Sequence, residues 1–205
     1  MGSKDTYFSL NRDELDLLSD TSFFLRKKQL INRIVQLYGT IEEEYDLIYQ
    51  HHRQKLPVNL SGKRGKISRG ENYKGLPYVI LDAPALFEKG GVFAFRTLMW
   101  WGQSFSITFH LSGTYFDQHV DTIFPALNQL DGDILICINT KEWEHHHEPE
   151  NYIPLDTFLK SKDNNLDYLR KKGFLKLSKM LPLDKHPLLI QTGTGFLNEI
   201  LNLVK

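Results

Sequence analysis

The chain has 205 residues, of which 41% are hydrophobic and 12% aromatic, and this composition argues against an intrinsically disordered protein. Its 25 lysine and arginine residues balance its 25 aspartate and glutamate residues, so the formal net charge is zero. That balance argues against a dedicated nucleic-acid or membrane-surface protein, because such proteins usually carry a basic excess. The single cysteine excludes an intrachain disulfide bond.

The amino-terminal sequence MGSKDTYFSL lacks the apolar core of a secretory signal. Nowhere do about 18 uncharged apolar residues, the length needed to span a bilayer, follow one another. We therefore expect a cytoplasmic protein with no membrane partner. The length suits one α+β domain over residues 1–205, with a helical part over 1–55 and a sheet-containing part over 76–205.

The first strong pattern predicts a long helix from about Thr21 to Lys55, after a shorter helix from about Asn11 to Leu18. From Ile31 onward, apolar residues recur in alternating steps of three and four, which keeps them on one face of a helix. The stripe consists of Phe24, Ile31, Ile34, Tyr38, Ile41, Tyr45 and Ile48. Its width, increased by flanking leucines, is typical of a helix that packs on a sheet, and the alternative is a helix that dimerises.

Residues 56–75 indicate a glycine-rich basic loop, followed by a strand over 76–81 and a helical turn over 85–89. Between Arg53 and Lys74 the chain carries seven basic residues and one acidic residue. Such a loop can follow a phosphate backbone. The segment from 141 to 156 carries five acids and one base, however, and can complement the basic loop instead. We therefore do not expect a nucleic-acid partner.

The clearest strand pattern is a hairpin in which residues 92–101 and 104–112 flank Gly102-Gln103. A glycine at the first position of a two-residue loop is typical of a type II′ turn. This register pairs Arg96 with Phe109, and it predicts that the arginine lies on the apolar face of the hairpin.

A guanidinium in apolar surroundings needs an anionic partner, because burying an unpaired charge costs several kcal/mol. Arg96 is therefore a candidate for binding an anionic ligand. The alternatives are an ion pair with a structural acid such as Asp82 or Glu88, or a register shifted by one residue that places Arg96 in water.

The opposite face of the second strand carries Ser106, Thr108 and His110, because alternate residues of a strand point to the same side. The expected register adds Thr97 opposite Thr108. This polar row is a candidate site for a polar ligand, and the alternative is an ordinary solvated face. No acid is placed by sequence spacing to orient His110, so a catalytic triad is not predicted.

A tract of three histidines, His145-His146-His147, lies between glutamates. In an extended segment His145 and His147 share a face, and imidazole with carboxylate suits zinc or another transition metal. His145 and His147 are therefore candidate metal ligands, although the spacing identifies no third ligand. The alternative is a solvated acidic loop.

The remaining pattern predicts a helix over 115–127, a central strand over 133–138, a helix over 165–171, a strand over 188–191 and a final helix over 195–204. Residues 174–182 fit either a helix or a strand. Thr194 is expected to cap the final helix. Strands in an antiparallel hairpin, with helices in separate blocks, are typical of an α+β fold rather than of a βαβ alternation.

Three segments resemble the YktB-like bacterial proteins, a family of unknown function. The resembling residues are Tyr73-Lys74-Gly75-Leu76-Pro77-Tyr78 before an apolar hairpin, Lys185-His186-Pro187-Leu188-Leu189, and Gly195-Phe196-Leu197. The resemblance implies an α+β fold with a curved antiparallel sheet and helices on one side. With the pattern above, this predicts a sheet with a central hairpin, packed by the long N-terminal helix and a C-terminal helix. The resemblance implies no activity.

The sequence as a whole favours a binding module in which Arg96, or Thr108 and His110, recognises a small polar or anionic ligand. The alternative function is a metal-dependent hydrolase that uses His145 to His147, with Glu148 as base. We expect a monomer or a weak homodimer. The sequence identifies no cofactor and does not decide between an enzyme and a non-catalytic protein.

Overall fold

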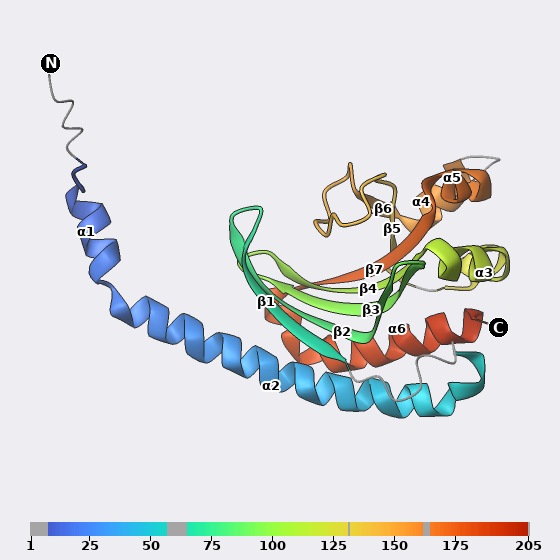
Figure 1. The fold of residues 1–205 in the computed structure, drawn as a ribbon, viewed down its shortest axis with the longest axis horizontal. Coiled ribbons are helices and arrows are strands. Elements are labelled where there is room, and N and C mark those ends of the chain that lie inside the picture. Colours follow the sequence, from blue (N-terminus) through green and yellow to red (C-terminus); the bar gives the residue numbers. More distant parts are fainter. Residues whose placement is uncertain (1–7, 57–64, 131, 162–164, 205) are drawn as a thin grey trace, which may run out of the picture.

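The computed structural model describes residues 8–56, 65–130, 132–161 and 165–204. Within these residues seven strands form one antiparallel sheet in the order β1-β2-β3-β4-β7-β5-β6 (Figure 1). The strands are β1 Lys66–Tyr73, β2 Leu76–Glu88, β3 Gly91–Trp100, β4 Ser104–Ser112, β5 Leu135–Cys137, β6 Tyr152–Pro154 and β7 Phe174–Pro182. The α-helices of the described residues are α1 Arg12–Ser19, α2 Thr21–His51, α3 Gly113–Ile123, α4 Leu155–Ser161, α5 Asn165–Lys172 and α6 Leu189–Leu203. The 3-10 helices of the same residues are η1 Arg53–Lys55, η3 Phe124–Gln129 and η4 Leu183–Leu188.

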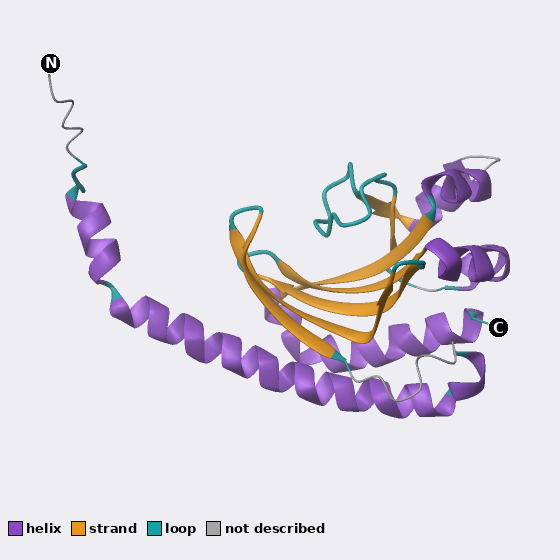
Figure 2. Cartoon of the chain, in the orientation of Figure 1, coloured by secondary structure: helices purple, strands orange, loops and turns teal. Residues whose placement is uncertain are grey.

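The sheet is curved, and α2 and α6 lie side by side against one of its faces (Figures 1 and 2). We call this the helix face, and the opposite side of the sheet the loop face. The predicted α+β fold with a curved antiparallel sheet, packed by an N-terminal and a C-terminal helix, is confirmed. None of the helices in the described segments combines the length and the apolar character needed to cross a membrane.

The predicted stripe of the long helix explains how α2 packs. Tyr38, Ile41 and Tyr45 are completely buried against the sheet. The Tyr45 ring lies 5.2 Å from that of Phe95, and its hydroxyl lies 3.2 Å from Thr97 Oγ1, so both strand residues belong to the helix face.

A glycine of α6 allows the two helices to approach closely. A Cβ atom added at Gly193 would lie 2.2 Å from the Tyr45 hydroxyl oxygen, so only glycine fits against that ring.

The prediction that residues 188–191 form a strand and that Thr194 caps a helix starting near 195 is wrong. The helix already begins at Leu189, and the Thr194 hydroxyl donates back to Ile190 O, four residues earlier.

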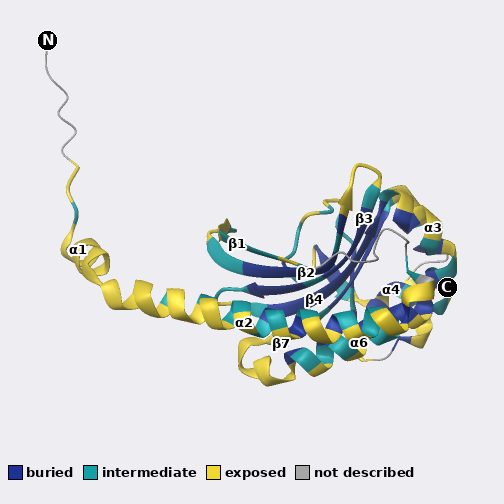
Figure 3. Ribbon diagram, turned by 60° about the horizontal axis from the view of Figure 1, so that its bottom comes forward, coloured by how far each residue is buried: buried dark blue, intermediate teal, exposed yellow. Residues whose placement is uncertain are grey.

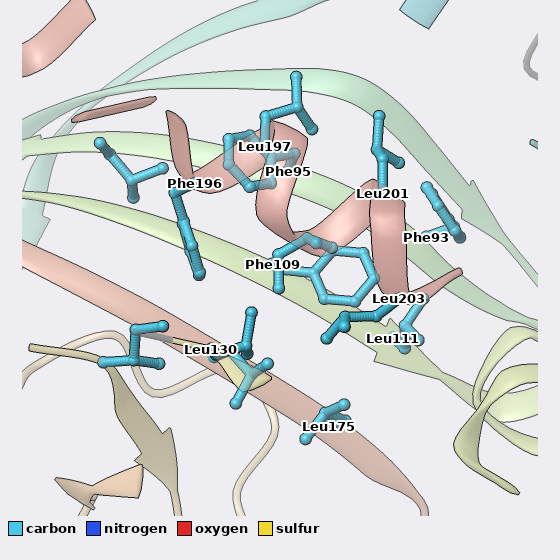
Figure 4. Packing of buried hydrophobic residues seen from close by; sticks show 14 of the residues in the cluster. Phe93, Phe95, Phe109, Leu111, Leu130, Leu175, Phe196, Leu197, Leu201 and Leu203 are labelled. Atoms are coloured by element: carbon cyan, nitrogen blue, oxygen red, sulfur yellow. The ribbon is translucent and has the colours of Figure 1, made fainter. Parts of the chain in front are cut away.

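The core lies between the helix face of the sheet and the helices α2 and α6. Figure 4 shows Phe95 and Phe109 of the sheet beside Phe196 and Leu197 of α6. Each of these side chains is almost completely buried. Burial of one such side chain stabilises the fold by about 1.5–3 kcal/mol, so the alternation along β3 and β4 fixes which face of the hairpin meets the helices.

Two segments that were predicted to be irregular are strands. Residues 66–73, expected in the basic loop, form edge strand β1, where Gly70 leaves room for the Tyr78 ring of β2. Residues 85–89 were expected as a helical turn, but β2 continues to Glu88 past an irregularity in its pairing between Asp82 and Ala85. The ambiguous segment 174–182 is strand β7, and β5 lies one strand from the edge rather than at the centre.

The hairpin turn is one residue longer than predicted, and this changes the register. Trp100 pairs with Ser104, so the turn contains Trp101, Gly102 and Gln103. Gly102 has a φ of 69°, which glycine adopts without strain. Arg96 therefore pairs with Thr108 instead of Phe109, and the prediction that it lies on the apolar face is wrong. Thr97, expected beside Thr108, instead pairs with Ile107 on the helix face.

Candidate functional site

Polar side chains form two rows across the loop face. Asp82, Arg96, Thr108 and Ser178 are directly paired on the adjacent strands β2, β3, β4 and β7. Two residues along the strands, about 7 Å away, His110 of β4 pairs with Lys176 of β7. These side chains lie between the sheet and the segment that covers it, and Asp82, Thr108, His110, Lys176 and Ser178 are all buried.

The covering segment consists of residues 138–151 between β5 and β6, and we call it the histidine loop. The buried Lys176 ammonium donates to Glu142 O at 2.9 Å and also to Glu144 O. Burial lowers the pKa of Lys176 to about 8, although the neighbouring carboxylates act in the opposite direction. Lys176 thus anchors the histidine loop to β7 through its backbone carbonyl groups.

Tyr73, at the end of β1, holds the loop from the other side. Its hydroxyl oxygen accepts from the backbone N–H groups of His145, at 2.8 Å, and His146, at 3.0 Å. The same hydroxyl donates to Glu144 Oε2 at 3.1 Å. One phenol therefore fixes three consecutive residues of the loop, including the first of the candidate metal ligands.

Replacing Tyr73 with phenylalanine is expected to release this part of the loop. Two backbone donors and one carboxylate lose a shared partner, and an unsatisfied buried group costs about 1–3 kcal/mol. We expect the free energy of unfolding to fall by that amount and the His145 and His146 amides to exchange hydrogen faster. Urea unfolding and hydrogen exchange measure the two effects. Unchanged exchange at both amides would contradict this role for Tyr73.

Arg96 makes a bidentate ion pair with Asp82. Nε donates to Oδ1 at 2.7 Å and Nη2 donates to Oδ2 at 3.0 Å, the geometry that a guanidinium and a carboxylate share. The Arg96 side chain is 12% exposed and that of Asp82 is 6% exposed. Of the alternatives predicted for Arg96, the ion pair with Asp82 is thus the one that forms. The register shift also occurs, but it places Arg96 on the loop face without exposing it to open solvent.

A third contact of Arg96 determines the state of His145. Nη1 lies 2.9 Å from His145 Nε2. A guanidinium can only donate, so Nε2 accepts and the proton of the neutral ring lies on Nδ1. The pKa of His145 is held well below its ordinary value, first by burial and then by the positive charge of Arg96.

His147 belongs to a second chain of contacts. Its Nε2 lies 2.9 Å from Ser178 Oγ, which in turn lies 2.9 Å from Thr108 Oγ1. Its ring stacks on Tyr152 with centroids 4.7 Å apart. Burial, followed by the charge of Lys176, lowers the pKa of His147 to about 4. Because Ser178 is completely buried, its hydroxyl supports the histidine and is not a nucleophile open to a substrate.

His110 faces the loop as well, with Nε2 2.9 Å from Glu142 Oε1. Burial outweighs the carboxylate and lowers the pKa of His110. The contact with His110 lowers the pKa of Glu142 in turn, more than partial burial raises it. The lowered pKa values favour a neutral His110 imidazole next to an ionised Glu142 carboxylate.

Two aromatic side chains border the cluster where it meets solvent. Phe87 of β2 and Trp143 of the histidine loop are both exposed, with ring centroids 6.2 Å apart. The Arg96 guanidinium carbon lies 5.9 Å from the centroid of the Phe87 ring. The centroids of the His110 and Trp143 rings are 5.4 Å apart. We call Phe87 and Trp143 the aromatic rim.

The residues singled out in the sequence come together here. Arg96, Thr108 and His110 on the sheet meet His145 and His147 from the histidine loop, although these two groups were predicted as separate sites. Sequence reasoning missed Lys176 and Ser178. Their spacing of two residues in the segment FLKLSKMLP is a strand signal, but the segment's apolar spacing also fitted a helix.

The contacts of the two candidate metal ligands diverge. His145 Nε2 lies against Arg96 and His147 Nε2 against Ser178, so these nitrogens face different partners. Among the residues that the structure describes, no group of three or more histidine, cysteine, aspartate or glutamate side chains is arranged to hold a metal ion. The geometry therefore offers no observation that favours the hydrolase alternative.

Comparisons with family models, with curated proteins and with solved structures find no match for this chain. The resemblance to the YktB-like proteins stays a prediction.

Proposed function

We propose that the protein is a binding module whose ligand is held at the loop face, between the aromatic rim and the polar cluster beneath the histidine loop. The observation that supports this most is the meeting of Arg96, Thr108, His110, His145 and His147, five residues from two distant parts of the chain, at one place next to exposed aromatic rings. Buried polar groups at this density are costly for a fold that only needs stability.

Arg96 is the group that we propose for contact with the ligand. Within the described part of the chain, Asp82 and His145 take three of its five N–H groups. Two donors remain on a guanidinium that Asp82 holds rigidly, and a rigid donor loses less entropy on binding. Asp82 balances the charge of Arg96, so recognition depends on the two remaining N–H groups, which can only donate and therefore select an anionic or strongly polar acceptor.

The aromatic rim determines the rest of the ligand. Exposed aromatic rings next to a charged, nearly closed cluster suit a small molecule with an apolar ring beside its anionic group. Phenyl phosphate carries both parts, while inorganic phosphate and phenol each carry one. These three compounds therefore form a probe set for the proposed site.

Thermal unfolding with each probe at equal concentration tests the proposal. At a hundredfold excess over Kd a ligand stabilises the folded state by about 2.7 kcal/mol. For a chain of this length that corresponds to a Tm increase of roughly 5–10 °C. We expect phenyl phosphate to raise the Tm more than phosphate or phenol does. Trp143→Ala and Arg96→Lys should each reduce the increase.

Leu47→Ala is the matched control, because Leu47 is an exposed apolar residue of α2, the helix that packs on the side of the sheet opposite the loop face. It should leave the probe-induced increase unchanged. A Tm that does not respond to any of the probes would contradict the proposed ligand class. A response that Trp143→Ala and Arg96→Lys both leave intact would place the binding elsewhere.

A further inference from the structure

The N-terminal part of the chain extends away from the sheet as a helical arm, here residues 8–30 (Figures 1 and 3). The arm contains α1 and the first turns of α2. Every residue of α1 is described, and none is buried. The large apolar residues that the arm exposes are Phe8, Leu15, Leu17, Leu18, Phe23, Phe24, Leu25 and Leu30.

The arm continues the stripe by which α2 packs on the sheet. The stripe positions Tyr38, Ile41 and Tyr45 are fully buried, whereas Phe24, on the same stripe, is 56% exposed. Between them, Lys27 forms an ion pair with Glu71 of the edge strand β1. Beyond this contact the helix keeps its apolar character, and its large apolar side chains stay exposed in the described part of the chain.

The charges of the arm are divided into two blocks. Residues 12–20 contain four acids and one base, a net charge of −3, and residues 26–33 contain four bases and no acid, a net charge of +4. Two such arms lying antiparallel would place each acidic block against the basic block of the other. Two parallel arms would place like charges together, at a cost.

We propose that the arm docks on the same arm of a second copy of this chain, in an antiparallel arrangement. A two-fold axis near Phe23, between the two blocks, makes the surface self-complementary, as an isologous interface requires. A membrane surface fits less well, because the acidic block would face anionic lipid headgroups.

The exposed apolar area is of the size that such an interface needs. Phe8, Phe23 and Phe24 are 88%, 45% and 56% exposed. With about 200 Å² for a whole phenylalanine, they expose roughly 400 Å². One partner of a standard interface buries about 800 Å², and the five exposed leucines of the arm supply a similar further area.

Sedimentation velocity tests the proposal on the full chain. The unmodified protein should sediment as a dimer of twice 23.9 kDa, and Leu18→Glu/Phe24→Glu should sediment as a monomer with an unchanged circular dichroism spectrum. Leu47→Glu, at an exposed leucine of α2 outside the arm, should remain a dimer. A monomer at every attainable concentration of the unmodified protein would overturn the proposal, as would a monomer that binds vesicles of phosphatidylserine through the arm.

Charge exchange tests the antiparallel arrangement separately. Asp13→Lys/Asp16→Lys should raise the dimer Kd at least about tenfold, because basic blocks then face each other. Adding Arg26→Glu/Lys28→Glu to that variant lowers the net charge of residues 26–33 from +4 to 0, which removes the repulsion and should lower the Kd again toward its original value. If the fourfold variant stays as weak as the double variant, the antiparallel arrangement is wrong.

Discussion

Replacing Arg96 with methionine is expected to lower the free energy of unfolding by about 3–5 kcal/mol, the usual cost of removing one partner from a buried ion pair. Asp82 would keep a carboxylate that is 6% exposed and has lost the guanidinium that it accepts from through both oxygens. His145 would lose the donor at its Nε2 as well. Urea unfolding at neutral pH, followed by tryptophan fluorescence, measures the loss.

The double variant Asp82→Leu/Arg96→Met is the informative comparison. It removes both charges and replaces them with apolar groups, which is often close to neutral for a buried pair. We therefore expect the double variant to be more stable than Arg96→Met alone, with a coupling energy of about 0.5–3 kcal/mol in the cycle. A loss below about 1 kcal/mol for Arg96→Met would mean that water reaches Asp82 in the folded protein.

In the proposed function Arg96 has two roles, which use different N–H groups: one set binds Asp82 and His145 in the fold, and the other binds the ligand. Arg96→Lys keeps a positive charge beside Asp82 but loses the planar fork. It should therefore fold and still bind probes poorly, whereas Arg96→Met should be destabilised before any probe is added. The two variants separate a structural role from a recognition role at one position.

The sequence predicted the layers of the fold well, because burial of alternate residues leaves a clear pattern. The stripe of α2, from Ile31 to Ile48, and the alternation in β4 each identified a buried face. The register of the central hairpin was missed by one residue. Gly102-Gln103 fits a two-residue turn, but the structure includes Trp101 in the turn, where its N–H donates to Pro77 O of β2. A contact with a third strand is not visible in the hairpin sequence.

The sequence identified residues of the candidate site, but it did not predict that they come together in one cluster. Arg96 and His145 are 49 residues apart, and their contact depends on the histidine loop folding back over β3. Tyr73 and Lys176, which hold that loop, act through its backbone N–H and C=O groups. Backbone groups are the same in every residue, so the sequence of the loop carries little information about which side chain will bind it.

Acid is expected to destabilise the protein through three histidines of the candidate site. His110, His145 and His147 all have lowered pKa values, with burial as the first cause. In the unfolded chain an imidazole takes up a proton near pH 6.5, while His147 in the folded protein does so only at about 4. The unfolded state therefore binds more protons between these values, so the stability that is present above about pH 6.5 is lost as the pH falls. His147 alone accounts for about 3 kcal/mol.

Urea unfolding at several pH values between about 7 and 5 measures this dependence above the range in which most carboxylates titrate. His147→Gln should make the dependence shallower, because a histidine that takes up a proton in the unfolded chain at a higher pH than in the folded protein is gone. His186→Gln, at an exposed histidine of η4, is the control and should not change it. Constant stability of the unmodified protein across this range would mean that the folded cluster protonates as readily as the unfolded chain. The histidine loop would then open to water in solution, and a site closed by Arg96, Tyr73 and Lys176 would have to be abandoned.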